Sequence, residues 1–451
     1  MRRWILRSPA RFSVLVFVVL IGVGTLMLSL PASSAGKPID LIDTLFTATS
    51  AACVTGLVVL DTGKDFSLFG QGIILLLIQV GGLGIMTLST LFLLMAGRRP
   101  SLVGHFVIKD ALTDGKERSL STLLWDVVLF TVIIEGIGAA VMFLRFLPGR
   151  SAPDAAYLAI FHSVSAFCNA GFSIFQDSFM GYREDWTLNL TLCFLIISGG
   201  IGFLVLSELK RKRPLKRHSW ARLSLHSKIV LSTTAILVAT GTLLIFLMEW
   251  NGTLKGLSLP TRLLAAFFQS VTARTAGFNT LPIGAMATQT LFLVVLLMFI
   301  GASPGSCGGG IKTTSLASLV AMGVSRLLGR EKPQLFRRTI PGDSTGKAIS
   351  ILMVSAVVVV AATMALLISE LGEVSHMASR GKFFELLFEV VSAFGTVGLS
   401  TGVTGGLTLV GKIILTIVMF VGRLGPLVIA MAVSRSSAPR YTYAEENIMV
   451  G

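Results

Sequence analysis

Long apolar stretches follow one another along the chain and are separated by short polar segments. A helix needs roughly 20 residues to cross a bilayer, so stretches of this length indicate a polytopic membrane protein. We expect spans at about 12–30, 70–96, 121–147, 187–208, 228–250, 287–325 (interrupted), 346–370 and 407–433. The predicted fold is therefore an all-α polytopic membrane protein with eight spans.

Four shorter, half-apolar segments alternate with these spans. They cover 41–54, 154–168, 259–273 and 380–394, which is too short to cross the bilayer, so we interpret them as re-entrant pore helices. A phenylalanine stands ten residues before a glycine in each, and a large apolar residue follows the glycine. The four pairs are Phe46 and Gly56, Phe161 and Gly171, Phe267 and Gly277, and Phe388 and Gly398. This spacing predicts a fourfold internal repeat.

Each predicted repeat consists of a span, a pore helix, a glycine turn and a second span. An even number of spans per repeat makes the repeats parallel, with pseudo-fourfold symmetry around one central ion pore. The boundaries are 1–97 for repeat 1, 98–210 for repeat 2 with its preceding cytoplasmic loop, 211–327 for repeat 3 with its interrupted helix, 328–434 for repeat 4, and 435–451 for a cytoplasmic tail.

Composition supports the membrane assignment. The chain is 53% hydrophobic and 14% charged, whereas a soluble domain is about 25% charged. The net charge of +15 lies on the N-terminus and on 98–118, 210–228 and 326–347, between apolar segments. This distribution follows the positive-inside rule, with both termini cytoplasmic, and no soluble nucleic-acid-binding domain accompanies it. The apolar stretch 13–30 is longer than a signal-peptide core, so we interpret it as a retained first span.

Four glycine turns at equivalent depth suit a cation filter. Backbone carbonyl oxygens can replace the hydration shell of a large monovalent cation, and glycine leaves no side chain in the lumen. The pore helices would end there with partial negative charge. The alternative is that the glycines only let helices pack closely, but four matched positions favour the filter. The predicted filter residues are Val54, Thr55, Gly56, Asn169, Ala170, Gly171, Thr275, Ala276, Gly277, Thr396, Val397 and Gly398.

A second set of glycines recurs inside the spans that follow three of the turns. It includes Gly81, Gly199 and Gly422, which we interpret as packing residues rather than filter residues. The third repeat departs from this pattern, because Pro304 and several glycines stand there and predict an interrupted helix. The residues alone leave open whether this segment is a simple kink or a moving element.

Arg423 lies inside the last predicted span, where a charge is costly and faces a cavity or a partner. One interpretation is a cation barrier below the filter. The other is a structural ion pair with Glu385 or Glu389 of the fourth pore helix.

Other polar residues receive structural interpretations. We expect Arg274 to brace the third pore helix through an acidic partner, Glu135 to belong to a similar pair, and His162 to pack in its pore helix. Residues 305–313 resemble a phosphate-binding loop, but Ile311 separates the last glycine from Lys312, so we reject it. The scattered cysteines indicate neither a disulfide framework nor a zinc site, and we expect buried packing residues: Cys53, Cys168, Cys193 and Cys307.

Several motifs resemble the Trk/Ktr/HKT superfamily of potassium transporters, and most closely its KtrB-type membrane subunits. The resemblance covers nearly the whole chain and is strongest at 272–279, 308–314, 420–426 and 445–451. It implies four helix–pore–helix repeats and a homodimer with one pore per protomer in the cell (inner, plasma) membrane. It also makes the four turn glycines the filter of a potassium-uptake protein. Relatives that prefer sodium often have serine at the first position, so Gly56 favours potassium.

The resemblance further implies a gate and a partner. The intramembrane loop would gate the path below the filter, and Arg423 would restrain cation leak. The implied gate residues are Gly305, Ser306, Gly308, Gly309, Gly310, Lys312 and Arg423. A cytosolic KtrA-type ring that binds ATP, ADP or NAD would dock on the basic face, so we expect no nucleotide or other cofactor in this chain.

Rival functions find less support in the residues. A secondary transporter of another small solute would need a larger cavity and usually inverted repeats. A membrane-embedded enzyme would need paired carboxylates, a histidine cluster or a Ser/Lys dyad on facing spans, and none stands out. Sodium coupling is typical of Ktr relatives, yet no residue set here defines a sodium site.

Overall fold

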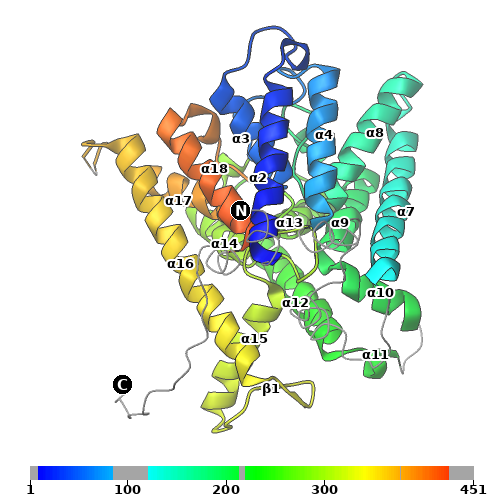
Figure 1. Ribbon diagram of the computed structural model, residues 1–451, viewed down its shortest axis with the longest axis vertical. Coiled ribbons are helices and arrows are strands. Elements are labelled where there is room, and N and C mark those ends of the chain that lie inside the picture. The colour runs from blue at the N-terminus through cyan, green and yellow to red at the C-terminus, as the bar shows by residue number, and fades with distance from the viewer. Residues whose placement is uncertain (1–8, 85–119, 213–218, 376, 426–451) are drawn as a thin grey trace.

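The computed structural model describes residues 9–84, 120–212, 219–375 and 377–425. In these ranges the elements are helices apart from one small hairpin, in which β1 (Gln334–Leu335) pairs antiparallel with β2 (Arg338–Thr339). Gln334 faces Thr339 and Leu335 faces Arg338. The chain is therefore a helical assembly, as the apolar pattern predicts (Figure 1).

The helices follow the order expected for alternating long and short segments. The first half contains α2 (Pro9–Leu28), α3 (Leu41–Ala52), α4 (Leu68–Gly82), α7 (Leu120–Phe146), α8 (Ala152–Phe167), α9 (Trp186–Ile201), α10 (Phe203–Lys212) and α11 (Ser219–Arg222). The second half contains α12 (Leu225–Met248), α13 (Leu259–Thr272), α14 (Thr288–Phe299), α15 (Thr313–Leu327), α16 (Gly342–Leu371), α17 (Lys382–Gly395) and α18 (Leu409–Leu424). Single 3₁₀ turns lie at Pro31–Ser33, Met180–Tyr182, Ile283–Ala285 and Thr404–Gly406.

Helix lengths only partly match the eight predicted spans. Among the described residues, α2, α7, α12 and α16 are long and apolar enough to cross a bilayer, and the α9–α10 pair makes a fifth if it counts as one span. Helices α4 and α14 are apolar but shorter. The predicted spans at 70–96 and 407–433 continue beyond α4 and α18, and most of those further residues lie outside the described part of the chain. The count of eight stays a prediction.

Two of the predicted spans contain breaks. The interruption expected within 287–325 is confirmed, because α14 ends at Phe299 and α15 begins at Thr313. The continuous helix expected at 187–208 is wrong, since α9 and α10 meet at a bend of 98°. Gly202 has φ +97° at this bend, and the amide of Phe203 donates to the carbonyl of Gly305 at 3.0 Å. At the bend this amide bonds to the segment between α14 and α15 rather than to its own helix.

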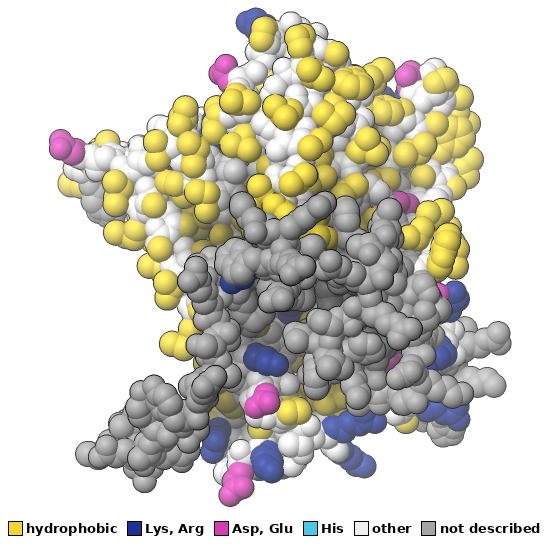
Figure 2. All heavy atoms as spheres, viewed as in Figure 1, with side chains coloured by type: hydrophobic (Ala, Val, Ile, Leu, Met, Phe, Trp, Pro, Cys, Tyr) yellow, Lys and Arg dark blue, Asp and Glu magenta, His cyan; other side chains and the backbone are white. Residues whose placement is uncertain are grey.

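The four short helices α3, α8, α13 and α17 lie inside the assembly, while the long helices present apolar side chains outward. Phe46, Phe161 and Phe388 are fully buried. Leu26, Val132 and Val357 on long helices are more than 60% exposed, which is expected for a surface that faces lipid. In Figure 2, hydrophobic side chains cover the upper part of the molecule and Lys and Arg gather at the lower end.

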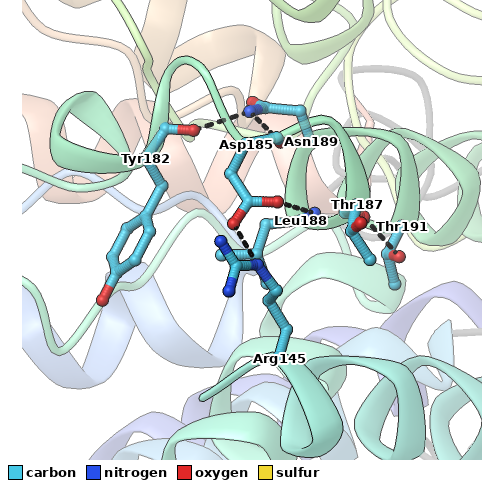
Figure 3. A network of polar contacts seen from close by, with 7 residues as sticks. All are labelled: Arg145, Tyr182, Asp185, Thr187, Leu188, Asn189 and Thr191. Carbon is cyan, nitrogen blue, oxygen red and sulfur yellow. Dashed lines mark hydrogen bonds and ion pairs between the residues drawn. The ribbon is translucent and has the colours of Figure 1, made fainter. Parts of the chain in front are cut away.

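Polar contacts join the two long helices within the predicted repeats. At the end of α7, Arg145 donates to the carboxylate of Asp185, the N-cap of α9, at 2.6 Å (Figure 3). At the end of α16, Glu370 accepts from the hydroxyl of Thr408, the N-cap of α18, at 2.7 Å. Asp185 and Thr408 themselves accept from the amides of Leu188 and Gly411, so each contact ties a capped helix N-terminus to the preceding long helix.

The third such contact involves a buried carboxylate. Glu249 follows α12 and is fully buried. It accepts hydrogen bonds from the amides of Thr253 and Ala287, each at 2.9 Å, and Ala287 is the N-cap of α14. Glu249 therefore joins α12 to α14.

Replacing Glu249 by Ala should destabilise the protein, because two buried amides lose their acceptor and each costs about 1–3 kcal/mol. We expect the midpoint of thermal unfolding in detergent, measured by fluorescence-detected size exclusion, to fall by several degrees. The exposed Glu373→Ala is the control. Equal midpoints for the two variants would contradict this role of Glu249.

Candidate ion filter and intramembrane loop

Each short helix ends in a turn with the same unusual backbone. The residue two positions before the glycine has positive φ in all four turns: Val54 (+56°), Asn169 (+59°), Thr275 (+75°) and Thr396 (+50°). The glycines Gly56, Gly171, Gly277 and Gly398 have φ of +91°, +69°, +82° and +89°. Three of the four are β-branched, and such a residue at positive φ is strained and persists only where its surroundings hold it. Four matched cases indicate one shared turn geometry.

The four glycines lie against one another in a closed ring. A Cβ atom built on Gly56 would lie 3.0 Å from the Cα of Gly171, and one on Gly171 would lie 2.9 Å from the Cα of Gly277. A Cβ on Gly277 would lie 3.3 Å from the Cα of Gly398, and one on Gly398 would lie 2.9 Å from the Cα of Gly56. The ring therefore has no room for a side chain at these four positions.

Carbonyl oxygens accompany the glycines around this ring. The carbonyl of the residue before each ring glycine lies next to the glycine of a neighbouring turn. The carbonyl of Ala170 lies next to Gly56, that of Ala276 next to Gly171, that of Val397 next to Gly277, and that of Thr55 next to Gly398. The non-glycine members of the predicted filter are all fully buried. The structure thus brings together the residues that the sequence singled out, and it places a backbone carbonyl oxygen beside each ring glycine.

Hydroxyl groups of the short helices hold the turns. Ser50 and Ser392 accept hydrogen bonds from the amides of Gly56 and Gly398, each at 3.1 Å. In the other two turns, Ser165 donates to the carbonyl of Phe172 at 2.7 Å and Thr272 donates to that of Phe278 at 2.6 Å. These bonds fix the orientation of each turn with respect to the helix that precedes it.

The second set of glycines lies outside the ring, against the ends of the short helices. A Cβ atom on Gly81, Gly199 or Gly422 would strike the backbone carbonyl of Ala52, Phe167 or Phe394, respectively. Each of these carbonyls belongs to the residue four positions before a ring glycine. The contacts fit the packing interpretation, because only glycine lets the following helix approach so closely.

The interrupted segment between α14 and α15 lies against two of the turns. The amide of Gly309 donates to the hydroxyl of Thr396 at 3.0 Å, and a Cβ on Gly308 would strike the hydroxyl of Thr275. Lys312 folds back over the segment and donates to the carbonyl of Gly308 at 2.7 Å. The glycines therefore permit a close contact between the segment and the strained residues of the third and fourth turns.

The bend between α9 and α10 holds the other side of this segment. Ser303 and Cys307 donate through their amides to the carbonyls of Gly200 and Gly199, at 3.1 Å and 3.2 Å. Ser306 donates to the carbonyl of Ser303 at 2.6 Å. The segment is therefore a non-helical loop that bonds to the end of α9 and to the fourth turn.

Arg423 contacts this loop directly. Its guanidinium donates to the carbonyls of Cys307 and Gly81, and its side chain is buried. The alternative ion pair with Glu385 or Glu389 is wrong. A positive charge thus lies among backbone carbonyls, between the loop and the end of α4.

Two further expectations about charged residues are wrong. Arg274 donates to the hydroxyl of Thr234 at 3.4 Å, and in the described part of the chain no carboxylate lies within ion-pair distance of it. Glu135 accepts from the amide of Gln79 at 3.4 Å rather than from a cation. Both groups contact uncharged partners, and the Nε of Arg274 is buried without a hydrogen-bond partner in the described part of the chain.

The remaining minor expectations agree with the structure. His162 is fully buried within α8, and all four cysteines are free and buried. The sequence did not reveal that a further side chain of the short helix, His162 in α8 and Glu389 in α17, bonds to the segment just beyond the turn.

Comparison with known proteins places this arrangement in a family. The sequence matches the family described as TrkH, cation transport protein, over residues 6–441. It is 37% identical over 451 residues to the Ktr system potassium uptake protein B of Bacillus subtilis (strain 168), covering 100% of this chain and 98% of the relative. The chain belongs to the TrkH family of cation transport proteins.

A further relative matches over nearly its whole length, and one solved structure shares the fold. The potassium/sodium uptake protein NtpJ of Enterococcus hirae is 36% identical over 98% of this chain and 97% of its own. The crystal structure of the potassium transporter TrkH from Vibrio parahaemolyticus matches with a TM-score of 0.73 at 20% identity, covering 94% of this chain and 84% of that one. The match to this crystal structure supports the helical membrane-protein fold. The TrkH family is one of transporters and not of enzymes.

Two glycines of α4 provide a matched test of the packing role. Gly81→Ala should destabilise the protein, because the added methyl group would strike the backbone carbonyl of Ala52. Gly72→Ala should leave stability unchanged or raise it by up to about 1 kcal/mol, since nothing lies within 4 Å of its Cβ position. Thermal unfolding in detergent measures both, and equal midpoints would contradict the close approach.

Proposed function

We propose that this chain is the membrane subunit of a potassium-uptake system, and that potassium crosses the membrane through the ring of four glycine turns. The closed ring of Gly56, Gly171, Gly277 and Gly398, with a carbonyl beside each, is the observation that carries the proposal. A ring of fixed carbonyl oxygens suits a cation that has lost part of its water. The potassium-uptake relatives of the same length support the choice of ion.

The proposed architecture follows from the same ring. Four parallel helix–pore–helix repeats, with eight spans in all, would surround one axial path. The twelve predicted filter residues from Val54 to Gly398 would line its narrowest part. The C-termini of α3, α8, α13 and α17 end at the turns, so four helix dipoles would add negative potential beside the ion. An anion would be repelled by the same oxygens and dipoles.

The intramembrane loop and Arg423 form the proposed gate. The loop lies against Thr275 and Thr396 of the filter turns, and Arg423 bonds to its Cys307 carbonyl. A fixed positive charge close to the path raises the energy of a passing cation. Conduction would then require the loop, including Gly305, Ser306 and Gly308–Gly310 with Lys312, to move away from the path.

The proposed assembly is a homodimer in the plasma membrane with both termini cytoplasmic. Exposed basic residues surround the small hairpin at one end of the molecule (Figure 2). They suit docking of a KtrA-type ring, which would carry the regulatory nucleotide. The basic residues are Arg326, Arg330, Lys332, Arg337 and Arg338. Sodium is a second ion to test, because the Enterococcus relative is named for both ions.

The deciding experiment for function is complementation of a bacterium that lacks potassium uptake. Cells that express the chain, with and without a nucleotide-binding partner subunit, should grow at low potassium concentration. Purified protein in liposomes should also admit radioactive rubidium down its gradient. Uptake of another small solute without rubidium flux would contradict the proposal.

Replacing Gly56 by Ser should reduce the preference for potassium over sodium. The added side chain has no space beside Gly171, and positive φ strains it further. We expect about a tenfold loss in the potassium-to-sodium flux ratio, which corresponds to ~1.4 kcal/mol. The exposed Gly36→Ser, with no atom within 4 Å of its Cβ position, is the control. A folded Gly56→Ser protein with unchanged discrimination would count against the filter.

Weakening the gate should raise flux. Arg423→Ala removes the buried charge, and we expect the initial rate of rubidium uptake to rise about tenfold, which corresponds to a barrier lower by ~1.4 kcal/mol. Deletion of residues 306–308 should act in the same direction by shortening the loop. If both folded variants conduct at or below the wild-type rate, the loop and Arg423 do not restrain the ion.

A further inference from the structure

Glu389 binds the segment that directly follows the fourth ring glycine. This residue of α17 is fully buried. Its carboxylate accepts from the hydroxyl of Ser400 at 2.7 Å and from the amide of Thr401 at 3.1 Å. Its second oxygen accepts from the hydroxyl of Thr404 at 2.7 Å. A buried carboxylate is costly unless it is hydrogen-bonded, and here every bond goes to the backbone or side chains just beyond Gly398.

His162 makes the same contacts in the second repeat. Its Nδ1 lies 2.8 Å from the carbonyl of Leu158, which can only accept, so Nδ1 carries the proton and Nε2 is an acceptor. That Nε2 accepts from the hydroxyl of Ser173 at 3.2 Å and from the amide of Ile174 at 3.3 Å. The imidazole stacks on Phe175 with ring centroids 4.6 Å apart, which fixes its orientation.

The two sets of contacts are equivalent position by position. His162 and Glu389 each directly follow the phenylalanine that begins the repeated motif. Their partners stand two and three residues after the ring glycine: Ser173 and Ile174 after Gly171, and Ser400 and Thr401 after Gly398. An imidazole in one repeat and a carboxylate in the other thus accept from a serine hydroxyl and a backbone amide at equivalent positions. This match indicates a shared requirement rather than chance packing.

The other two repeats lack this contact. Thr47 and Phe268 occupy the same position; the hydroxyl of Thr47 has no partner in the described part of the chain, and a phenylalanine cannot accept. In the third repeat, the amide of Asn279 instead donates to Ser178 of a neighbouring loop at 3.2 Å. Gly171 and Gly398 are therefore the braced pair, and they lie diagonally in the order of the ring.

We propose that His162 and Glu389 are positioning residues that fix the backbone after Gly171 and Gly398, and that they thereby set ion discrimination by the ring. This inference rests on the proposed potassium function. Discrimination between two cations depends on how firmly the oxygens keep their number and spacing. If the segment after the glycine loses its contacts to His162 or Glu389, the neighbouring carbonyl oxygens can move closer to a smaller ion. The ring would then discriminate less well against sodium.

The test compares two replacements of Glu389 in liposomes. Glu389→Leu removes all of its acceptors, and we expect the potassium-to-sodium flux ratio to fall about tenfold, equivalent to ~1.4 kcal/mol. Glu389→Gln keeps an oxygen for Ser400 and Thr401, so the ratio should stay within about twofold of wild type. His162→Leu should lower the ratio as Glu389→Leu does.

Two variants separate positioning from general stability. Glu370→Leu removes a carboxylate of the same repeat that also accepts from an amide and a hydroxyl, those of Thr408, away from the ring. It should lower thermal stability and leave the flux ratio unchanged. Ser400→Ala should lower the ratio on its own, and should add no further loss when combined with Glu389→Leu, because both act through one contact. Ser400→Ala alone also tests the proposal if the Glu389→Leu protein does not fold.

Different results would overturn the positioning role and the proposed potassium function. A wild-type ratio in Glu389→Leu, or in Ser400→Ala where the Leu variant does not fold, would overturn the positioning role. An equal loss in the Gln and Leu variants would assign the effect to the charge of Glu389 instead. If the wild-type protein itself carries no potassium, the proposed function fails; if it discriminates and the variants match it, only this inference fails.

Discussion

The close approach of four backbone turns is the constraint on which the rest of the structure depends. Gly56, Gly171, Gly277 and Gly398 meet without side chains between them, and each has a carbonyl from a neighbouring turn beside it. Such a ring forms only if the C-terminal ends of the four short helices converge. The long helices, their capping contacts and the second set of glycines all hold the short helices in that position.

Much of this arrangement could be predicted from the sequence because it depends on local rules. Apolar length indicates spans, and a segment too short to cross the membrane indicates a re-entrant helix. Glycine at four matched positions predicts a turn that excludes side chains. Pro304 and the glycines around it likewise predict a break in their helix. These features depend on residue type and spacing, which a single sequence displays.

The partners of the polar residues could not be predicted in the same way. Arg423 bonds to carbonyls of Cys307 and Gly81 rather than to a carboxylate, and the residue after the bend at Gly202 bonds to a loop that is distant in sequence. Backbone carbonyls are present at every position, so the sequence gives no sign of which one will meet a guanidinium. The matching contacts of His162 and Glu389 could not be predicted for a related reason, since the two side chains differ in chemistry.

The most direct test of the central claim is to locate the ion. A crystal structure of the protein in rubidium, with anomalous diffraction recorded at the rubidium absorption edge, measures its position without reference to transport. The account predicts an anomalous peak on the axis of the ring, surrounded by the turns of Gly56, Gly171, Gly277 and Gly398. A ring without such a peak, with rubidium bound elsewhere or with one of the four glycines facing lipid, would contradict it.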